Sequence, residues 1–141
     1  MFLLDTNVIS ELRKAGAGKA DAQVMRWMEG TVASTLHVSV ITLEELEIGT
    51  LRMERRDAVQ GRLLRRWLEQ HVMPTFAGRM LPLDIEVARR SAGLQVPDPM
   101  PIRDAYIAAT ALVHGLTVVS RNTRDFAACG AQVLNPWQAP V

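Results

Sequence analysis

The stretch Gly115-Leu116-Thr117-Val118-Val119-Ser120 decides the fold class of this chain. Its apolar and β-branched side chains follow one another without the alternation of apolar and polar residues that marks a strand with one wet face. Such a strand is typical of a parallel sheet that helices cover on both faces. Gly115 is a natural C′ residue for a helix that starts near Arg103. The sequence therefore predicts a helix leading into a buried parallel strand.

The same order of strand and helix is found elsewhere in the chain. Phe2–Leu4 is a short apolar strand, followed by a helix through Arg13 that Asp5-Thr6-Asn7 can cap. Leu36–Ile41 alternates as a strand, and Thr42 opens the next helix because Thr42-x-x-Glu45 is a capping-box pattern. Further helices are expected after Asp21, Asp57 and Asp84, and further short strands at Met80–Leu83 and Val133–Leu134. This order predicts an α/β fold, a three-layer α/β/α sandwich with a mainly parallel central sheet.

The bulk properties predict one globular domain, residues 1–141. Hydrophobic residues make up 48% of the 141 residues, and no repeat or linker divides the chain. The N-terminus lacks the pattern of a signal peptide. The longest apolar stretch, Ala105–Val113, falls short of the roughly 18 residues that span a bilayer. Cys129 is the single cysteine, so no intrachain disulfide can form, and the scattered histidines predict no zinc site. We therefore expect a cytoplasmic protein.

Arginine dominates the cations after Lys19, and six arginines fall between Arg52 and Arg66. The net charge of +1 does not by itself indicate a nucleic-acid partner. The arginine run can hold a phosphate backbone, or it can be the solvated face of a helix.

Four acids fall where the predicted sheet meets its helices. Asp5 follows the first strand, Glu45 lies in the first turn of the helix after Leu36–Ile41, and Asp125 follows the strand that ends at Ser120. Asp104 opens the helix before that strand and joins the others if its helix begins at the same rim. Ligand sites of open α/β sheets form at this rim. Two carboxylates ~4 Å apart repel by about 4 kcal/mol at an effective dielectric near 20, so such a cluster favours a hard cation such as Mg²⁺ or Mn²⁺. A metal held there suits phosphodiester hydrolysis.

Each acid also has a purely structural interpretation. Asp5 can cap the helix behind it, and Glu45 can complete the capping box. Asp104 can favour the helix dipole by about 0.3–1 kcal/mol, and Asp125 can be a turn residue, like the polar residues before it. Taken together, these interpretations leave unexplained why several acids recur at one rim.

Five stretches, in order and over essentially the whole chain, resemble the PIN-domain family, in particular its VapC-type toxins and their FitB-like branch. They are Leu4-Asp5-Thr6-Asn7-Val8-Ile9-Ser10, the Glu-Leu-x-x-Gly element within Ser39–Gly49, Arg103-Asp104-Ala105-Tyr106-Ile107-Ala108-Ala109-Thr110-Ala111, the closing strand and acidic loop His114–Phe126, and the tail Asn135-Pro136-Trp137. Each stretch alone is a weak signal, whereas five in sequence are specific.

The resemblance implies a Mg²⁺- or Mn²⁺-dependent endoribonuclease, the toxin of a type II toxin–antitoxin system, in which a metal-activated water attacks the RNA phosphodiester. The residues that match the family's acids, and are expected to be catalytic and metal-binding, are Asp5, Glu45, Asp104 and the more variable Asp125. The residues that match polar positions hydrogen-bonding within the site are Thr6, Ser120 and Asn122. One departure is Glu44-Glu45, since the first position is commonly neutral. We assign the ligand role to Glu45, which shares a helix side with Gly49, where a missing side chain would leave room for close approach.

The resemblance also implies partners. A co-encoded antitoxin that often binds DNA would neutralise the toxin, and a homodimer or higher toxin–antitoxin assembly is expected. The helices around Trp27 and Trp67 are candidate interfaces because aromatic anchors dominate such surfaces. Both tryptophans can equally belong to the core.

Two other functions stay open from the sequence. One is a phosphatase or receiver-like domain with a strand-end aspartate as phosphate acceptor. That chemistry needs a late cation, usually lysine. No lysine follows Lys19, although Arg121 or Arg124 could substitute. The other is a non-catalytic PIN-fold partner of a DNA-binding antitoxin in autoregulation, against which the complete set of acids argues.

Overall fold

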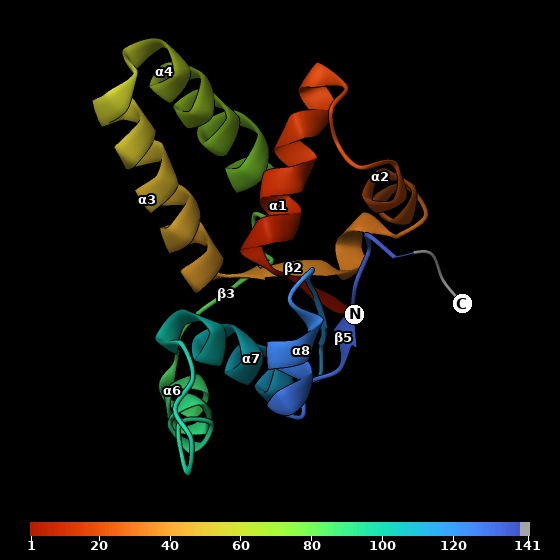
Figure 1. The fold of residues 1–141 in the computed structure, drawn as a ribbon, viewed down its shortest axis with the longest axis vertical. Coiled ribbons are helices and arrows are strands. Elements are labelled where there is room, and N and C mark those ends of the chain that lie inside the picture. The colour runs from red at the N-terminus through yellow and green to blue at the C-terminus, as the bar shows by residue number, and fades with distance from the viewer. Residues whose placement is uncertain (139–141) are drawn as a thin grey trace.

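The structure, a computed structural model, describes residues 1–138. Its centre is a five-stranded sheet with the order β3-β2-β1-β4-β5 (Figure 1). The strands are β1 (Phe2–Leu4), β2 (Leu36–Ser39), β3 (Met80–Leu81), β4 (Thr117–Val119) and β5 (Val133–Leu134). Every neighbouring pair is parallel. The parallel α/β prediction is confirmed, and β5 is an edge strand as expected.

Helices form a layer on each side of this sheet. They are α1 (Thr6–Arg13), α2 (Ala22–Glu29), α3 (Val40–Arg56), α4 (Ala58–Trp67), α5 (Met73–Thr75), α6 (Ile85–Gly93), α7 (Ile102–His114) and α8 (Thr123–Ala128). Figure 1 shows α1, α3 and α4 on one side of the sheet and α6, α7 and α8 on the other. The three-layer arrangement is therefore also confirmed.

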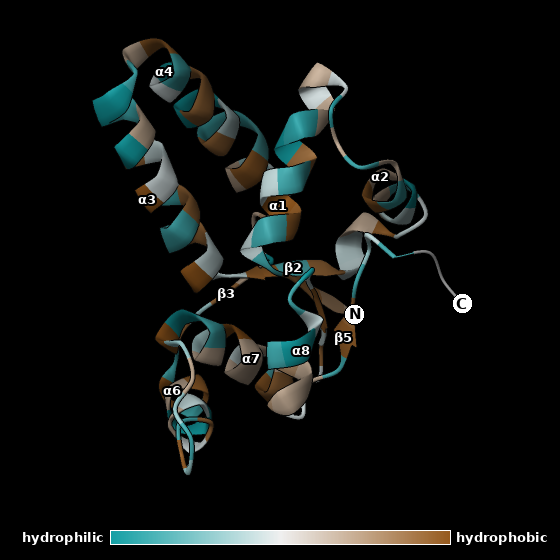
Figure 2. Cartoon of the chain, viewed as in Figure 1, coloured by the Kyte–Doolittle hydropathy of each residue, from teal (hydrophilic) through white to brown (hydrophobic). Residues whose placement is uncertain are grey.

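The two layers bury separate cores against opposite faces of the sheet. Leu4 and Val119 pack with the core residues of α1 and β2. Their chain neighbours Leu3 and Val118 pack with Ile107 and other residues of α7 and α8. Successive strand residues point to opposite faces, so strands covered on both sides need apolar residues at consecutive positions, as at Leu3–Leu4 and Val118–Val119. Brown accordingly dominates the centre of the sheet in Figure 2, although β2 also carries the polar His37 and Ser39.

The caps predicted from aspartates are present. Asp21, Asp57 and Asp84 accept hydrogen bonds from the first backbone N–H groups of α2, α4 and α6. Gly115 ends α7 with a φ of 67°, a left-handed conformation that favours glycine.

The boundary between β2 and α3 differs from the prediction. The strand ends at Ser39 and the helix begins at Val40, because the Ser39 hydroxyl caps it by accepting a 3.0 Å hydrogen bond from Ile41 N. The capping box from Thr42 to Glu45 is therefore wrong, and Glu45 lies in the second turn instead of the first. Alternating apolar residues look alike in a strand and in a buried first helical turn. A short helix, α8, was also not predicted between Ser120 and the last strand.

Both candidate interface tryptophans pack at least partly on the core. Trp27 and Trp67 are half-buried against the cluster that contains Leu4. The Trp27 ring meets Phe2 edge to face, with centroids 5.2 Å apart. The arginine run of α3 and α4 is exposed except for Arg65, which is half-buried. No helix within residues 1–138 is both long and apolar enough to cross a membrane.

Candidate functional site

Asp5 lies at the end of β1, where the strand turns into α1. It is 6% exposed and caps α1 by accepting a 2.8 Å hydrogen bond from Thr6 N. Ser120 Oγ, at the end of the neighbouring strand β4, donates a 2.7 Å hydrogen bond to Asp5 Oδ2. The pKa of Asp5 is raised, chiefly because burial disfavours its charged form. The hydrogen bonds from Ser120 and Thr6 oppose this rise, and the charge of Glu45 adds to it. Asp5 is thus a helix cap that also faces a second carboxylate.

Glu45 reaches the same place from α3. Thr6 Oγ1 donates a 2.7 Å hydrogen bond to Glu45 Oε1, and the Thr42 hydroxyl lies 3.2 Å from the same Thr6 oxygen. Its neighbour Glu44 is exposed and faces Arg103, with 3.5 Å between Glu44 Oε1 and Arg103 Nε. Adjacent helix residues point about 100° apart, so only Glu45 is directed toward Asp5.

Asp104 lies in the first turn of α7 and is half-buried. Its pKa is raised, first by burial and then by the negative charges of Asp5, Glu45 and Asp125. Asp104 therefore belongs to the same electrostatic cluster as Asp5 and Glu45. Asp125 is exposed on α8, outside the pocket that the other three acids line.

The polar residues at the end of β4 organise this cluster. Ser120 Oγ accepts hydrogen bonds from Asn122 N at 2.9 Å and from Asn7 Nδ2 at 3.2 Å. Asn7 Nδ2 also lies 3.3 Å from Asp5 Oδ2. The single Ser120 proton is given to Asp5, and both hydroxyl lone pairs are used. Asp5 is consequently fixed by a network that joins β1, α1 and β4.

These residues line one open pocket of about 530 Å³. Its lining consists of Asp5, Thr6, Asn7, Ser10, Glu11, Lys14, Glu45, Asp104, Arg121, Asn122 and Trp137. Of the acids and polar residues predicted for the site, Asp125 and Ser120 are not in this lining. Ser120 is fully buried behind Asp5.

The donors of this pocket fit a hard divalent cation in type and charge. Carboxylate oxygens are the ligands that Mg²⁺ and Mn²⁺ prefer. Burial and, to a smaller extent, the charges of neighbouring acids raise the pKa values of Asp5 and Asp104, so a cation beside them would favour their ionised forms. Within residues 1–138, no three His, Cys, Asp or Glu side chains lie in an arrangement that already closes around one metal ion. The hydroxyl groups of Ser120 and Thr6 donate hydrogen bonds to Asp5 and Glu45.

Sequence reasoning missed several pocket residues. Asn7 and Glu11 of α1 and Lys14, the residue that caps its C-terminus, recur at helical spacing, a periodicity that could have identified them. The expected role of Gly49 is wrong, since a Cβ atom at that position would have no neighbour within 4 Å. Among residues 1–138, no element packs closely enough there to require a glycine.

This chain is similar to known proteins over nearly its whole length. The sequence profile of the PIN domain matches residues 2–131. The VapC ribonuclease Y4jK of Sinorhizobium fredii is 40% identical over 98% of this chain and 99% of its own length. Toxin FitB of Neisseria gonorrhoeae is 37% identical over 97% of this chain and 99% of its own length.

Solved structures of similar proteins also match this fold over nearly the whole chain. The FitAcB structure from Neisseria gonorrhoeae matches with a TM-score of 0.89 and 36% identity, over 99% of this chain and all of that one (100%). A toxin–antitoxin complex from Klebsiella pneumoniae matches with a TM-score of 0.71 and 25% identity, over 99% of this chain and 100% of that one.

Proposed function

Because this chain belongs to the PIN-domain family, we propose that it is a divalent-metal-dependent endoribonuclease and the toxin of a toxin–antitoxin pair. The observation that carries the proposal is the pocket in which Asp5, Glu45 and Asp104 meet at the carboxyl ends of parallel strands. The pKa of Asp104, which burial and then the charges of the other acids raise, supports a site suited to a cation. The relative from Sinorhizobium fredii is named a ribonuclease.

Asp5, Glu45 and Asp104 would hold the metal. Asp125 of α8 lies outside the pocket lining, but its charge acts on Asp104, and it is the fourth acid of the proposed site. A bound Mg²⁺ or Mn²⁺ would polarise a phosphoryl oxygen and lower the pKa of a water molecule. The chain's own groups do the positioning: Ser120 and the N-terminus of α1 orient Asp5, and Thr6 orients Glu45. Lys14 and Arg121 on the pocket wall supply positive charge for the phosphates of a bound strand.

The test is cleavage of a defined single-stranded RNA by the purified chain, freed from any co-purified partner. We expect cleavage with Mn²⁺ or Mg²⁺, none with EDTA, and loss of about 100-fold or more in Asp104→Asn, the scale on which one group stabilising transition-state charge acts. Cleavage that survives both EDTA and Asp104→Asn would instead indicate a contaminating nuclease or a different site.

The toxin assignment requires a partner that keeps the nuclease inactive in the cell that makes it. The relative from Neisseria gonorrhoeae is named a toxin, and the Klebsiella pneumoniae structure is a toxin–antitoxin complex. We therefore propose a cognate antitoxin, DNA-binding in its other part, and a homodimer or higher assembly. Exposed apolar side chains on α3 and α4, among them Leu51, Val59 and Leu63, offer a surface for such contacts. Co-expression of the chain with the product of a neighbouring small reading frame, followed by size-exclusion chromatography, tests the pairing.

A further inference from the structure

The chain segment after β5 returns to the acidic pocket through a defined turn. Asn135 Oδ1 accepts a 2.9 Å hydrogen bond from Trp137 N, and Asn135 O accepts one from Gln138 N at 3.2 Å. Pro136 between them is buried. This turn places Trp137 on the wall of the pocket that Asp5 also lines. The Asn-Pro-Trp motif is thus part of the pocket, although nothing in the metal chemistry uses it.

Trp137 is held at its edge and covered on one face. Its indole Nε1 donates a 3.4 Å hydrogen bond to Glu11 Oε1. Glu11 is 7% exposed, and its other oxygen lies 3.2 Å from Lys14 Nζ. The Arg121 guanidinium lies over the indole ring, 4.4 Å from its centroid. Arg121 itself is exposed and lines the pocket. Arg121 and the indole of Trp137 therefore form a cation–π pair on the pocket wall.

This pair is attached directly to the acidic network. Arg121 follows Ser120, whose hydroxyl binds Asp5. The backbone N–H of Arg121 points to Asn7 Oδ1 at 3.4 Å, and the amide nitrogen of Asn7 lies 3.3 Å from Asp5 Oδ2. Because Arg121 also lines the pocket of the three acids, a group resting on its side chain would share that pocket with the carboxylates.

We propose that Arg121 and Trp137 form a stacking platform for an unpaired RNA base next to the scissile phosphate, with Glu11 as a positioning residue for the indole. The inference rests on the proposed ribonuclease function and adds a binding subsite to it. Proteins bind single-stranded RNA by stacking its bases on aromatic rings and on arginine planes. A phosphate contact alone would require only the charge of Arg121, whereas this arginine is also held against a ring.

The experiment measures binding of a fluorescein-labelled single-stranded RNA of about ten nucleotides by fluorescence anisotropy in EDTA, where no metal supports cleavage. The same RNA is prepared with one abasic nucleotide at each position in turn. Wild type should lose about fivefold or more in affinity at one position, the magnitude of one lost stacking contact. Arg121→Ala should bind intact RNA more weakly by a similar factor and be insensitive to the abasic nucleotide at that position.

Two conservative variants keep the test decisive if the Arg121→Ala substitution disturbs folding. Trp137→Phe keeps a ring under the guanidinium and should retain most of the affinity and the abasic sensitivity. Arg121→Lys keeps the charge without the plane and should lose the sensitivity. Arg89→Gln, an exposed arginine on α6, controls for loss of one positive charge and should bind like wild type.

Wild-type affinity that no abasic position changes would overturn the platform, as would Arg121→Lys with undiminished abasic sensitivity. In either case metal-dependent cleavage of the intact RNA by wild type would leave the proposed nuclease function standing. A wild-type protein that neither binds nor cleaves RNA would contradict the proposed function itself.

Discussion

Ser120 Oγ and Asp5 Oδ2 are 2.7 Å apart and joined by a hydrogen bond that spans 115 residues of chain. Neither side chain is appreciably accessible, with exposures of 0% and 6%. The bond joins the carboxyl ends of the neighbouring strands β1 and β4 and fixes one orientation of the Asp5 carboxylate. The acidic pocket is therefore built on the sheet itself, and the orientation of Asp5 depends on Ser120, a buried side chain outside the pocket lining.

Ser120→Ala should lower the free energy of unfolding by about 1–3 kcal/mol, because it leaves Asp5 and the Asn122 N–H without their buried partner. Urea unfolding at neutral pH measures the loss. Ser10→Ala, an exposed hydroxyl on the rim of the same pocket, is the matched control and should change stability by less than about 0.5 kcal/mol. Equal stabilities for the two variants would mean that the Ser120 network contributes no net stability.

Asp104→Asn should stabilise the metal-free protein at neutral pH. The pKa of Asp104 is raised in the fold by burial and by neighbouring negative charges, so the ionised form opposes folding. For a raised pKa, the contribution to stability is complete below the unfolded value, about 3.9, and is lost as the pH rises through the folded value. The gain in melting temperature over wild type should therefore be largest at neutral pH and shrink as the pH falls toward 4. A gain that is independent of pH would exclude this electrostatic cause.

Much of this architecture could be predicted from local patterns. The buried strand Leu116–Ser120, the aspartate caps and Gly115 each follow from interactions within a few residues. The start of α3 could not, because Val40 and Ile41 suit a strand as well as a buried helix turn. The Ser39 hydroxyl decides between the two by capping α3. From the sequence, Thr42 was an equally good candidate for the N-cap.

The pocket could be predicted only in part, because local sequence patterns do not encode contacts between residues far apart in the chain. Asp5, Glu45 and Asp104 stand at points where strands and helices meet, so the topology brings them together. Trp137 reaches the pocket through long-range contacts with Glu11 and Arg121, and no local pattern encodes those contacts. The Asn-Pro-Trp motif showed that the tail is distinctive but not where it lies.

Mn²⁺ should raise the melting temperature of wild type by mass action on the folded state, by an amount equivalent to about 2.7 kcal/mol at a concentration of 100 times the dissociation constant. Asp5→Asn and Asp104→Asn should each blunt the rise. Glu86→Gln, an exposed acid on α6, controls for loss of one negative charge. If all four proteins respond alike to a Mn²⁺ titration in differential scanning fluorimetry, the metal does not bind at these acids.

Glu45→Gln and Glu44→Gln form a matched pair on α3. A glutamine at position 45 still accepts the Thr6 hydrogen bond but loses the charge that a hard cation prefers. It should fold normally and lose most metal-dependent cleavage. Glu44→Gln gives up only an exposed contact with Arg103, worth at most about 1 kcal/mol, and should keep cleavage. RNA cleavage by Glu45→Gln alongside an inactive Glu44→Gln would show that the assignment is wrong by one residue.

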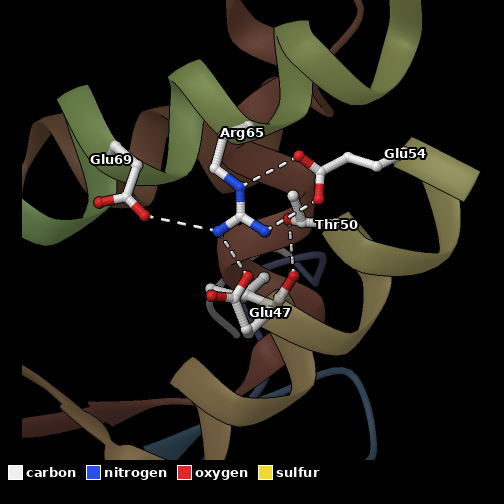
Figure 3. A network of polar contacts seen from close by, with 6 residues as sticks. Glu47, Thr50, Glu54, Arg65 and Glu69 are labelled. Carbon is white, nitrogen blue, oxygen red and sulfur yellow. Dashed lines mark hydrogen bonds and ion pairs between the residues drawn. The ribbon is translucent and has the colours of Figure 1, made fainter. Parts of the chain in front are cut away.

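The hairpin of α3 and α4 is held by one arginine and one glycine. Arg65 of α4 lies among three carboxylates, 2.6 Å from Glu47, 3.0 Å from Glu54 and 3.4 Å from Glu69 (Figure 3). One turn earlier, Gly61 lets the two backbones approach so closely that a Cβ atom would lie 2.4 Å from Glu54 Cα. Backbone cannot move aside as a flexible side chain can, so the close approach requires glycine.

Gly61→Ala should therefore destabilise the protein by at least about 1–3 kcal/mol, the usual range for an overpacked contact, because the added methyl must push α4 away from α3 and stretch the Arg65 contacts. Gly49→Ala in α3 is the matched control, since a Cβ atom there has no neighbour within 4 Å. With space available, alanine should instead stabilise the helix by up to about 1 kcal/mol. Urea unfolding of both variants measures the change in the free energy of unfolding, which should be negative for Gly61→Ala and positive for Gly49→Ala. Gly61→Ala as stable as wild type would mean that α3 and α4 separate without loss, and that their close contact contributes nothing to the stability of the fold.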